Sequence, residues 1–318
     1  MFLEYLQSTG FAVIQILIIS GIGYFLVKKN ILGAEALDAL SRLTIDITLP
    51  LLIFCQLIER FNFTLYPDWW IFPLLSIFIT LIGWIVGKVF SGFIVGAPPK
   101  MQFVSLITFQ NSGYLPLALL AALLPSDKLD VMFVCLFLFL AGFNLIMFSV
   151  GPLMLTQGKT KAFDAKTLLS PPVVAVLVSL LVIFFGLASA IPELIFKPLK
   201  MIGDCTLPLA MLVVGGGLAQ IRLAHVDKKV MGLTIFVKLF ILPAIGLFVA
   251  FALRVPESMA FLIVLQCAMP SAATLPALAR NYKQQDLLLS QGIFLTHLAS
   301  IITIPLFLSI YFMFAMVK

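Results

Sequence analysis

Ten long apolar runs, separated by short charged or Pro/Gly-rich junctions, dominate this sequence. Each run is close to the roughly 20 residues that a helix needs to cross the hydrocarbon core of a bilayer. The apolar residues are continuous instead of alternating, which excludes barrel strands, and only 11% of the residues are charged. The sequence therefore predicts an all-α polytopic membrane protein. Its ten transmembrane helices are expected at residues 11–27, 37–58, 69–94, 101–124, 130–155, 171–190, 197–219, 229–252, 258–280 and 287–315.

The distribution of basic residues predicts the orientation. Lys and Arg are twice as frequent at one set of span ends as at the other, twelve against six. Cytoplasmic loops are the Lys/Arg-rich ones, so the longest hydrophilic junction, at 156–167, is expected in the cytoplasm and both termini outside. The start of the chain, MFLEYLQSTG, has no basic region and no small-residue cleavage site, so we expect the first run to be retained as a span.

Two short sequence patterns occur twice. DITLPL at 46–51 returns as DCTLPL at 204–209, and a basic residue stands four positions before the aspartate in both copies. NSGYLP at 111–116 is echoed by SAATLP at 271–276, at nearly the same offset. The chain is therefore expected to consist of two repeats, residues 1–158 and residues 159–318. Each repeat has five spans, an odd number, so the second must be inverted, which is typical of secondary transporters. The alternative is a channel or receptor with accidental similarity.

The fourth and ninth spans carry helix-breaking and polar residues at membrane depth. Proline removes a backbone donor and glycine tolerates non-helical backbone, so both spans should be broken. Broken helices at equivalent positions of two repeats favour a substrate site, where half-helix N-termini attract an anion such as a carboxylate. The alternative is a pair of kinks that serve packing. The candidate residues are Asn111, Ser112, Gly113, Tyr114, Pro116, Pro270, Ser271, Ala272, Thr274 and Pro276.

The segment Asn111–Pro116 resembles the N-x-G-x-x-P crossover of the auxin efflux carrier family, and the span count and the central loop are similar as well. The resemblance covers essentially the whole chain, and the short central loop resembles that of bacterial members. It implies the crossed-helix fold of sodium/proton antiporters and bile-acid symporters. It also implies a scaffold of spans 1, 2, 6 and 7, and a transport domain of spans 3–5 and 8–10 that moves like an elevator.

The same resemblance implies the substrate class and the location. Family members bind a carboxylate near the crossover asparagine, here Asn111, with help from an asparagine in span five, here Asn144. The expected substrate is a small organic anion such as a dicarboxylate or an auxin-like acid. The expected location is a bacterial inner membrane, and a homodimer through the scaffold is implied.

Ionisable and amide groups within spans are candidates for ion or proton coupling. Asp46 and Asp204 could hold a cation or a proton, but Arg42 and Lys200, one turn away, favour locally neutralised scaffold helices. Gln266 and His297 are further candidates, with hydrogen-bonded packing as the favoured reading of the lone histidine. Lys238 is expected to extend its amine to the membrane surface, and attraction of an anion is the alternative.

No enzyme motif occurs in the chain. It has no Walker A loop, HExxH or nucleophile elbow, and its four cysteines lack metal-ligand spacing. We therefore expect no catalysis, cofactor, metal or nucleic acid, and transport driven by the membrane potential or by a Na⁺ or H⁺ gradient. The alternatives are a sodium-coupled organic anion symporter of the bile-acid type and a channel or receptor.

Overall fold

The computed structural model describes residues 2–156, 169–221, 223, 226–253 and 255–315. Seven helical rods in this part of the chain are long and apolar enough to cross a membrane. They are α1 (Phe2–Lys28), α2–η1–α3 (Ala34–Leu43, Thr44–Thr48, Leu49–Arg60), α4 with η2 (Ile71–Phe90, Ser91–Phe93), α7 (Ser126–Leu155), α10–α11 (Glu193–Asp204, Thr206–Gln220), α12–η4–α13 (Lys228–Phe236, Val237–Ile241, Leu242–Ala252) and α16 (Leu287–Ala315).

Shorter helices occupy the other three predicted ranges. They are α5 (Ala97–Thr108) and α6 (Tyr114–Leu123), α9 (Pro171–Phe184) with the short η3 (Ala188–Ala190), and α14 (Glu257–Ala268) and α15 (Leu275–Asn281). The prediction of an all-helical polytopic chain is therefore confirmed. Helix α1 begins nine residues before the predicted range, because the apolar pattern indicates membrane depth and not the end of a helix. The junction predicted to be cytoplasmic, 156–167, lies almost wholly outside the described residues.

Prolines distort three of the long rods in the way that a missing backbone donor requires. Pro50 leaves the carbonyl of Asp46 without its helical partner, and the preceding turn widens into the π-helix η1. Pro243 follows the π-helix η4 in the same way. Before Pro208 the rod breaks at Cys205, between α10 and α11.

The two ion pairs expected beside these prolines are not formed, which corrects the prediction. Lys200 pairs instead with Glu59 of α3, at 2.6 Å between Nζ and Oε2. Arg42 makes no ion pair with Asp46 within the described residues. In the rod of α2 and α3, the physical reason is the wide π-turn η1, which moves Asp46 away from Arg42, four residues before it. In the rod of α10 and α11, the Lys200 amine pairs with the Glu59 carboxylate of the adjacent α3 instead of with Asp204.

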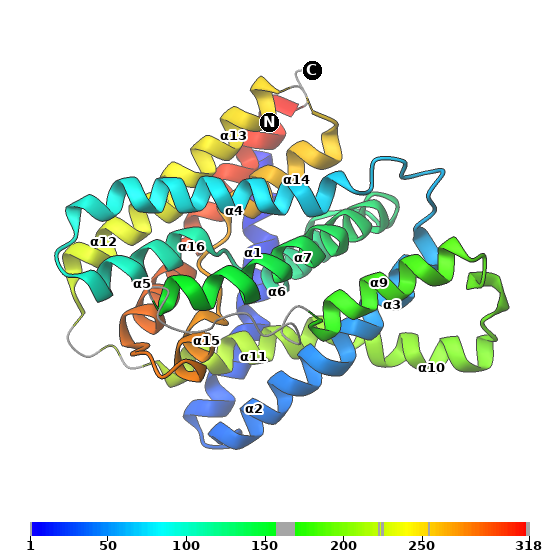
Figure 1. The fold of residues 1–318 in the computed structure, drawn as a ribbon, viewed down its shortest axis with the longest axis horizontal. Helices are drawn as coiled ribbons and strands as arrows, with labels where there is room; N and C mark the ends of the chain where they lie inside the picture. The colour runs from blue at the N-terminus through cyan, green and yellow to red at the C-terminus, as the bar shows by residue number, and fades with distance from the viewer. Residues whose placement is uncertain (1, 157–168, 222, 224–225, 254, 316–318) are drawn as a thin grey trace.

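Helix α1 packs along α11 and α16 near the middle of the molecule. Its closest approach is at Gly215 of α11, where an added Cβ would lie 1.7 Å from the carbonyl oxygen of Ser20. Only glycine fits this contact, as expected where membrane helices meet closely. Figure 1 shows α3, α9 and α10 on one side of α1, α5 and α12 on the other, and α4 running across both sides.

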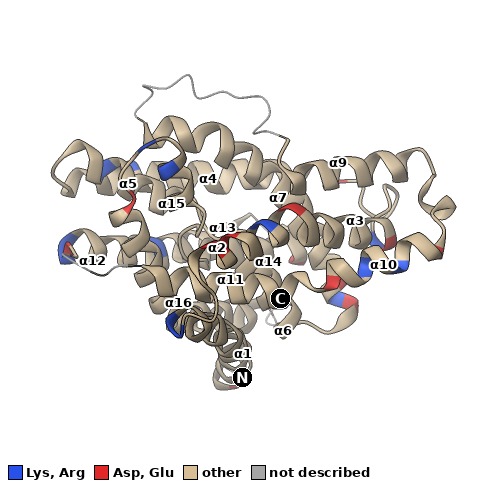
Figure 2. Ribbon diagram, turned by 90° about the horizontal axis from the view of Figure 1, so that it is seen from below, with Lys and Arg blue, Asp and Glu red and all other residues tan. Residues whose placement is uncertain are grey.

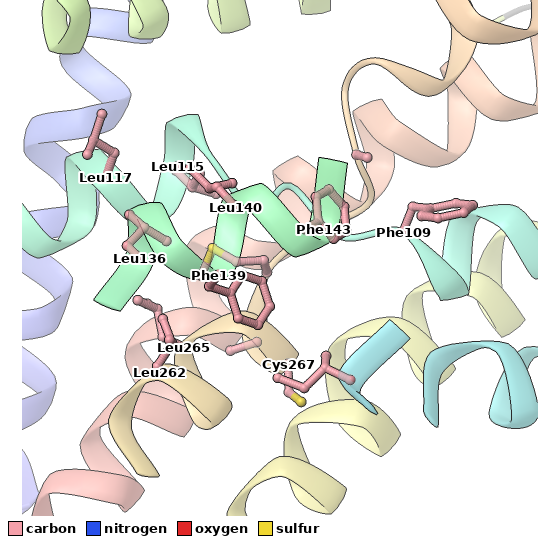
Figure 3. Close-up of a cluster of buried hydrophobic side chains, with 14 of the residues drawn as sticks. Phe109, Leu115, Leu117, Leu136, Phe139, Leu140, Phe143, Leu262, Leu265 and Cys267 are labelled. Atoms are coloured by element: carbon pink, nitrogen blue, oxygen red, sulfur yellow. The ribbon is translucent and has the colours of Figure 1, made fainter. Parts of the chain in front are cut away.

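Charged residues avoid most of the helical surface, as an apolar surrounding requires. Figure 2 shows most of the ribbon without charge, with charged residues on α12 at one side, around α10 at the other, and near α2 and α7 in the middle of the view. The buried core lies between α6, α7 and α14, next to the breaks in the fourth and ninth ranges. Figure 3 shows part of it, with Phe109 and Phe143 opposed at a ring-centroid distance of 6.3 Å.

Candidate functional site

The predicted breaks are present, and they meet. Helix α5 ends at Thr108 and α6 begins at Tyr114, while α14 ends at Ala268 and α15 begins at Leu275. The two intervening segments run antiparallel through the bridge between Gln110 and Ser271. The backbone N–H of Asn111 donates to the carbonyl of Pro270 at 2.8 Å, and that of Ala272 donates to the carbonyl of Phe109 at 2.9 Å. Backbone groups that lost their helical partners therefore satisfy one another, which is the condition for broken helices at membrane depth.

The prolines explain where the helices resume. Pro276 lies at the start of α15, and Pro116 is the third residue of α6. Backbone N–H groups in a first turn have no helical acceptor, so proline is tolerated there. Pro270 stands within the second break. Of the three prolines, the structure thus assigns one to a break and two to the helices that follow.

The C-terminal carbonyls of α5 also have partners, two of them from other parts of the chain. The hydroxyl of Ser271 donates to the carbonyl of Leu106 at 2.8 Å. The ammonium of Lys238 donates to the carbonyl of Ile107 at 2.8 Å, and this lysine is 1% exposed. The expectation that Lys238 extends to the membrane surface is therefore wrong. The partial negative charge at the end of α5 holds the ammonium inside.

A cavity of about 390 Å³ lies against the crossing segments. Its wall includes seven of the residues predicted for the substrate site, and Asp46 from η1. The seven are Asn111, Ser112, Gly113, Tyr114, Asn144, Ala272 and Thr274. A volume of this order fits a small organic molecule. We call this space the crossover cavity.

Among the described residues, three polar groups in the wall of the crossover cavity are buried without a hydrogen-bond partner. They are Gln110 Nε2, the Tyr114 hydroxyl and the Ser170 hydroxyl. Unpaired buried polar atoms are rare and costly, so a cluster of them needs an explanation. All three can donate a hydrogen bond, and the first turn of α6 adds free backbone N–H groups. The wall can therefore offer donors to an acceptor that enters the cavity.

The side chain of Asn111 is hydrogen-bonded to His297 of α16. Its Nδ2 lies 3.2 Å from His297 Nε2, and His297 Nδ1 lies 2.9 Å from the carbonyl oxygen of Ile293. His297 itself belongs to the wall of a second cavity, of about 490 Å³, between α2, α11, α15 and α16. The two cavities share Tyr114, Ala273 and Thr274 as a common wall.

A comparison with known families decides the class of the protein. A family profile described as "Membrane transport protein" matches residues 10–165 and 159–308, nearly the whole chain. The chain belongs to this membrane transport family. It is the auxin efflux carrier family that the crossover motif predicts, so that prediction is confirmed.

Similar proteins come from a plant and from two archaea, and the archaeal ones are named as transporters. The protein PIN-LIKES 7 of Arabidopsis thaliana is 21% identical, and the match covers 88% of this chain and 91% of that protein. An uncharacterized transporter of Methanothermobacter thermautotrophicus is 24% identical, with 92% and 95% covered. One from Methanocaldococcus jannaschii is 22% identical, with 92% and 96% covered. This member of the auxin efflux carrier family is thus an integral membrane transport protein and not an enzyme.

Some predicted residues of this family member lie away from the crossover cavity. Pro276 and His297 line the second cavity, and the side-chain amide of Gln266 donates to the carbonyl of Ser112 at 3.2 Å. Asp204 is exposed on the rod of α10 and α11. Pro116, Pro270 and Ser271 are not in the wall of the crossover cavity either.

Sequence reasoning missed Ser170 as a residue of this cavity. Ser170 directly precedes the two prolines that start α9, a serine–proline pair typical of a helix start. That signal predicts a helix boundary and no contact with the crossover. Its position in the same wall as Tyr114 and Gln110 follows from the packing of α9 against α3 and α7.

Proposed function

We propose that this member of the auxin efflux carrier family carries a small organic anion, and that its carboxylate binds in the crossover cavity. The observation that carries the proposal is the group of three buried, unpaired donors on Gln110, Tyr114 and Ser170. Such donors cost free energy in an empty site and are satisfied by an anionic acceptor. Asn144 adds an amide, and the first turn of α6 adds a partial positive charge.

The transport mechanism we propose is alternating access of the elevator type. The chain would cross a plasma membrane ten times in two inverted repeats, residues 1–158 and 159–318, with both termini outside. The antiparallel meeting of the two breaks supports the inverted repeat. Spans 1, 2, 6 and 7 would form the scaffold, through which two copies can dimerise, and spans 3–5 and 8–10 the moving domain. In this division the crossover cavity would lie between the two domains, since its wall includes Asp46 of span 2 and Asn144 of span 5.

A second candidate is cation-coupled symport of the same anion, as in carriers of the bile-acid type. The observation that favours it is the carboxylate of Asp46, which belongs to the cavity wall and has no ion pair among the described residues. A cation bound there would offset its repulsion of an anion. Replacing Asp46 and Asp204 by Asn together removes both carboxylates of the repeated hexapeptides. Sodium-dependent uptake that survives this change excludes them from coupling.

The test of anion transport uses purified protein in lipid vesicles. Uptake of malonate and of indole-3-acetate is measured with and without sodium, a proton gradient and a membrane potential. Saturable uptake of either acid supports a carrier, and dependence on sodium selects the symport candidate. Conductance that does not saturate with substrate would instead indicate a channel, and binding without any flux a receptor.

A further inference from the structure

The hydrogen bonds of His297 determine which of its ring nitrogens carries a proton. Nδ1 lies 2.9 Å from the carbonyl oxygen of Ile293, which can only accept, so Nδ1 must donate. In a neutral imidazole the other nitrogen then has no proton and accepts. His297 Nε2 therefore accepts from the Nδ2 group of Asn111. This bond joins the break between α5 and α6 to helix α16, and its two residues are 186 positions apart in sequence.

The same bond sets the orientation of the Asn111 side chain. The amide nitrogen is directed to His297, and no residue of the described chain donates to the amide oxygen Oδ1. Asn111 belongs to the wall of the crossover cavity, whereas His297 lies in the wall of the second cavity. While His297 is neutral, the amide nitrogen is thus engaged, and the oxygen, an acceptor, is the group that Asn111 has left to offer to the crossover cavity. An oxygen acceptor repels a carboxylate.

We propose that protonation of His297 reverses the Asn111 amide and so prepares the crossover cavity for a carboxylate. Protonated histidine donates from both nitrogens. Nδ1–H still donates to the carbonyl of Ile293. Nε2–H now needs an acceptor, and the amide of Asn111 supplies one by turning Oδ1 toward the ring. The NH₂ group of Asn111 then faces the cavity as a donor. One proton and one anion are bound together, and each raises the affinity for the other.

The second cavity gives His297 its own route to protons. Two charged groups of its wall neutralise each other, since Arg280 pairs with Asp286 at 2.5 Å. Asp38 of α2 is the remaining carboxylate of this wall, and Tyr114 contributes a phenol. The proton and the anion thus approach the Asn111–His297 pair from different cavities.

Other elements bring few charges toward His297. Helices α1 and α11 line its cavities with uncharged residues. Helix α13 has no charged residue, and those of α5, α12 and α14 stand in their first turns. From η4 comes Lys238, whose ammonium is bound to the carbonyl of Ile107.

The proposal rests on anion binding in the crossover cavity and adds the coupling ion, a proton. The direction of the pH dependence of anion affinity follows from the hydrogen bonds of His297. Binding of a carboxylate requires protonated His297, so affinity rises as pH falls. While His297 is mostly neutral in the free protein, the dissociation constant should fall by up to about tenfold per pH unit, since one proton is linked. Histidine ordinarily titrates between about pH 5 and pH 8, and the carboxylate of the probe stays ionised above about pH 6.

The experiment measures binding of indole-3-acetate and of malonate to the full-length protein in detergent, from about pH 8 to about pH 6. We compare wild type with His297→Gln, which keeps hydrogen-bonding capacity but does not titrate, and with Asp38→Asn as the matched control. Wild type and Asp38→Asn should bind more tightly at lower pH, whereas His297→Gln should lose this dependence. Titration of the probe itself is common to all three proteins.

Calorimetry of the wild type in two buffers of different ionisation enthalpy gives a second readout that needs no variant. Uptake of about one proton per anion bound is expected. Binding without proton uptake, or an unchanged pH dependence in folded His297→Gln, would overturn the proton coupling and leave anion transport standing. Absence of binding of either acid at every pH would instead refute the proposed function.

Discussion

The ammonium of Lys238 lies 2.8 Å from the carbonyl oxygen of Ile107, the last residue but one of the half-helix α5. Burial of a charge in a membrane protein costs several kcal/mol, and a single hydrogen bond to a charged group returns about 1.5–3 kcal/mol. The contact is thus a poor source of stability. The ammonium of Lys238 is bound to Ile107, three residues before Gln110 of the cavity wall, and is therefore well placed to attract an anion into the crossover cavity.

Replacing Lys238 by Met, a side chain of similar length, should separate these two effects. The substitution removes the desolvation cost of the buried ammonium, which is larger than the free energy of its hydrogen bond to Ile107. The free energy of unfolding should therefore stay equal or rise. Anion affinity should fall by roughly fivefold, about 1 kcal/mol of coulombic attraction. Thermal unfolding in detergent and equilibrium binding measure the two quantities. Lys228→Met, at an exposed lysine of the same rod, should change neither. A destabilised Lys238→Met protein with normal affinity would assign the lysine to structure alone.

Tyr114→Phe tests whether an unpaired donor of the crossover cavity serves the substrate. The Tyr114 hydroxyl is buried without a partner, so its removal should cost no stability and can raise it by about 1 kcal/mol. Affinity for a carboxylate should fall by about 1 kcal/mol, roughly fivefold, because one donor is lost. Binding and thermal unfolding are measured on the same preparation. Loss of stability with unchanged affinity would show that the hydroxyl has a structural partner instead.

Gly215→Ala tests the contact between α1 and α11, and Gly217→Ala is its matched control. An added Cβ at Gly215 would meet the carbonyl of Ser20 at 1.7 Å, whereas nothing lies within 4 Å of a Cβ at Gly217. Gly215→Ala should therefore force the helices apart and lower the unfolding temperature markedly. Gly217→Ala should be neutral or stabilising by up to about 1 kcal/mol, from helix propensity alone. Equal effects of the two substitutions on thermal unfolding would contradict the packing at Gly215.

The sequence predicts the features that depend on local backbone chemistry. Helix ends at Thr108 and Ala268 follow from the amide, glycine and proline residues that come next. Both the fourth and the ninth predicted spans contain a break, which predicts equivalent positions for the two broken segments. In the structure these two segments meet through the bridge between Gln110 and Ser271.

Features that depend on contacts distant in sequence could not be predicted. The bond between Asn111 and His297, the burial of Lys238 against α5 and the pair of Lys200 with Glu59 all join segments whose relative positions the apolar pattern leaves open. The π-helices were also missed. Proline predicts a lost hydrogen bond, but whether the turn widens or the helix breaks is decided by its surroundings, as the different outcomes at Pro50 and Pro208 show.

The most direct test of the crossover cavity as the anion site is equilibrium binding of malonate and indole-3-acetate to Asn111→Ala. Its backbone bond to Pro270 does not involve the side chain, so the crossing should persist and the protein should insert and unfold as the wild type does. We predict loss of detectable binding of both acids by Asn111→Ala at a pH where the wild type binds them. Unchanged affinity in a properly folded Asn111→Ala protein would contradict the assignment of the anion site.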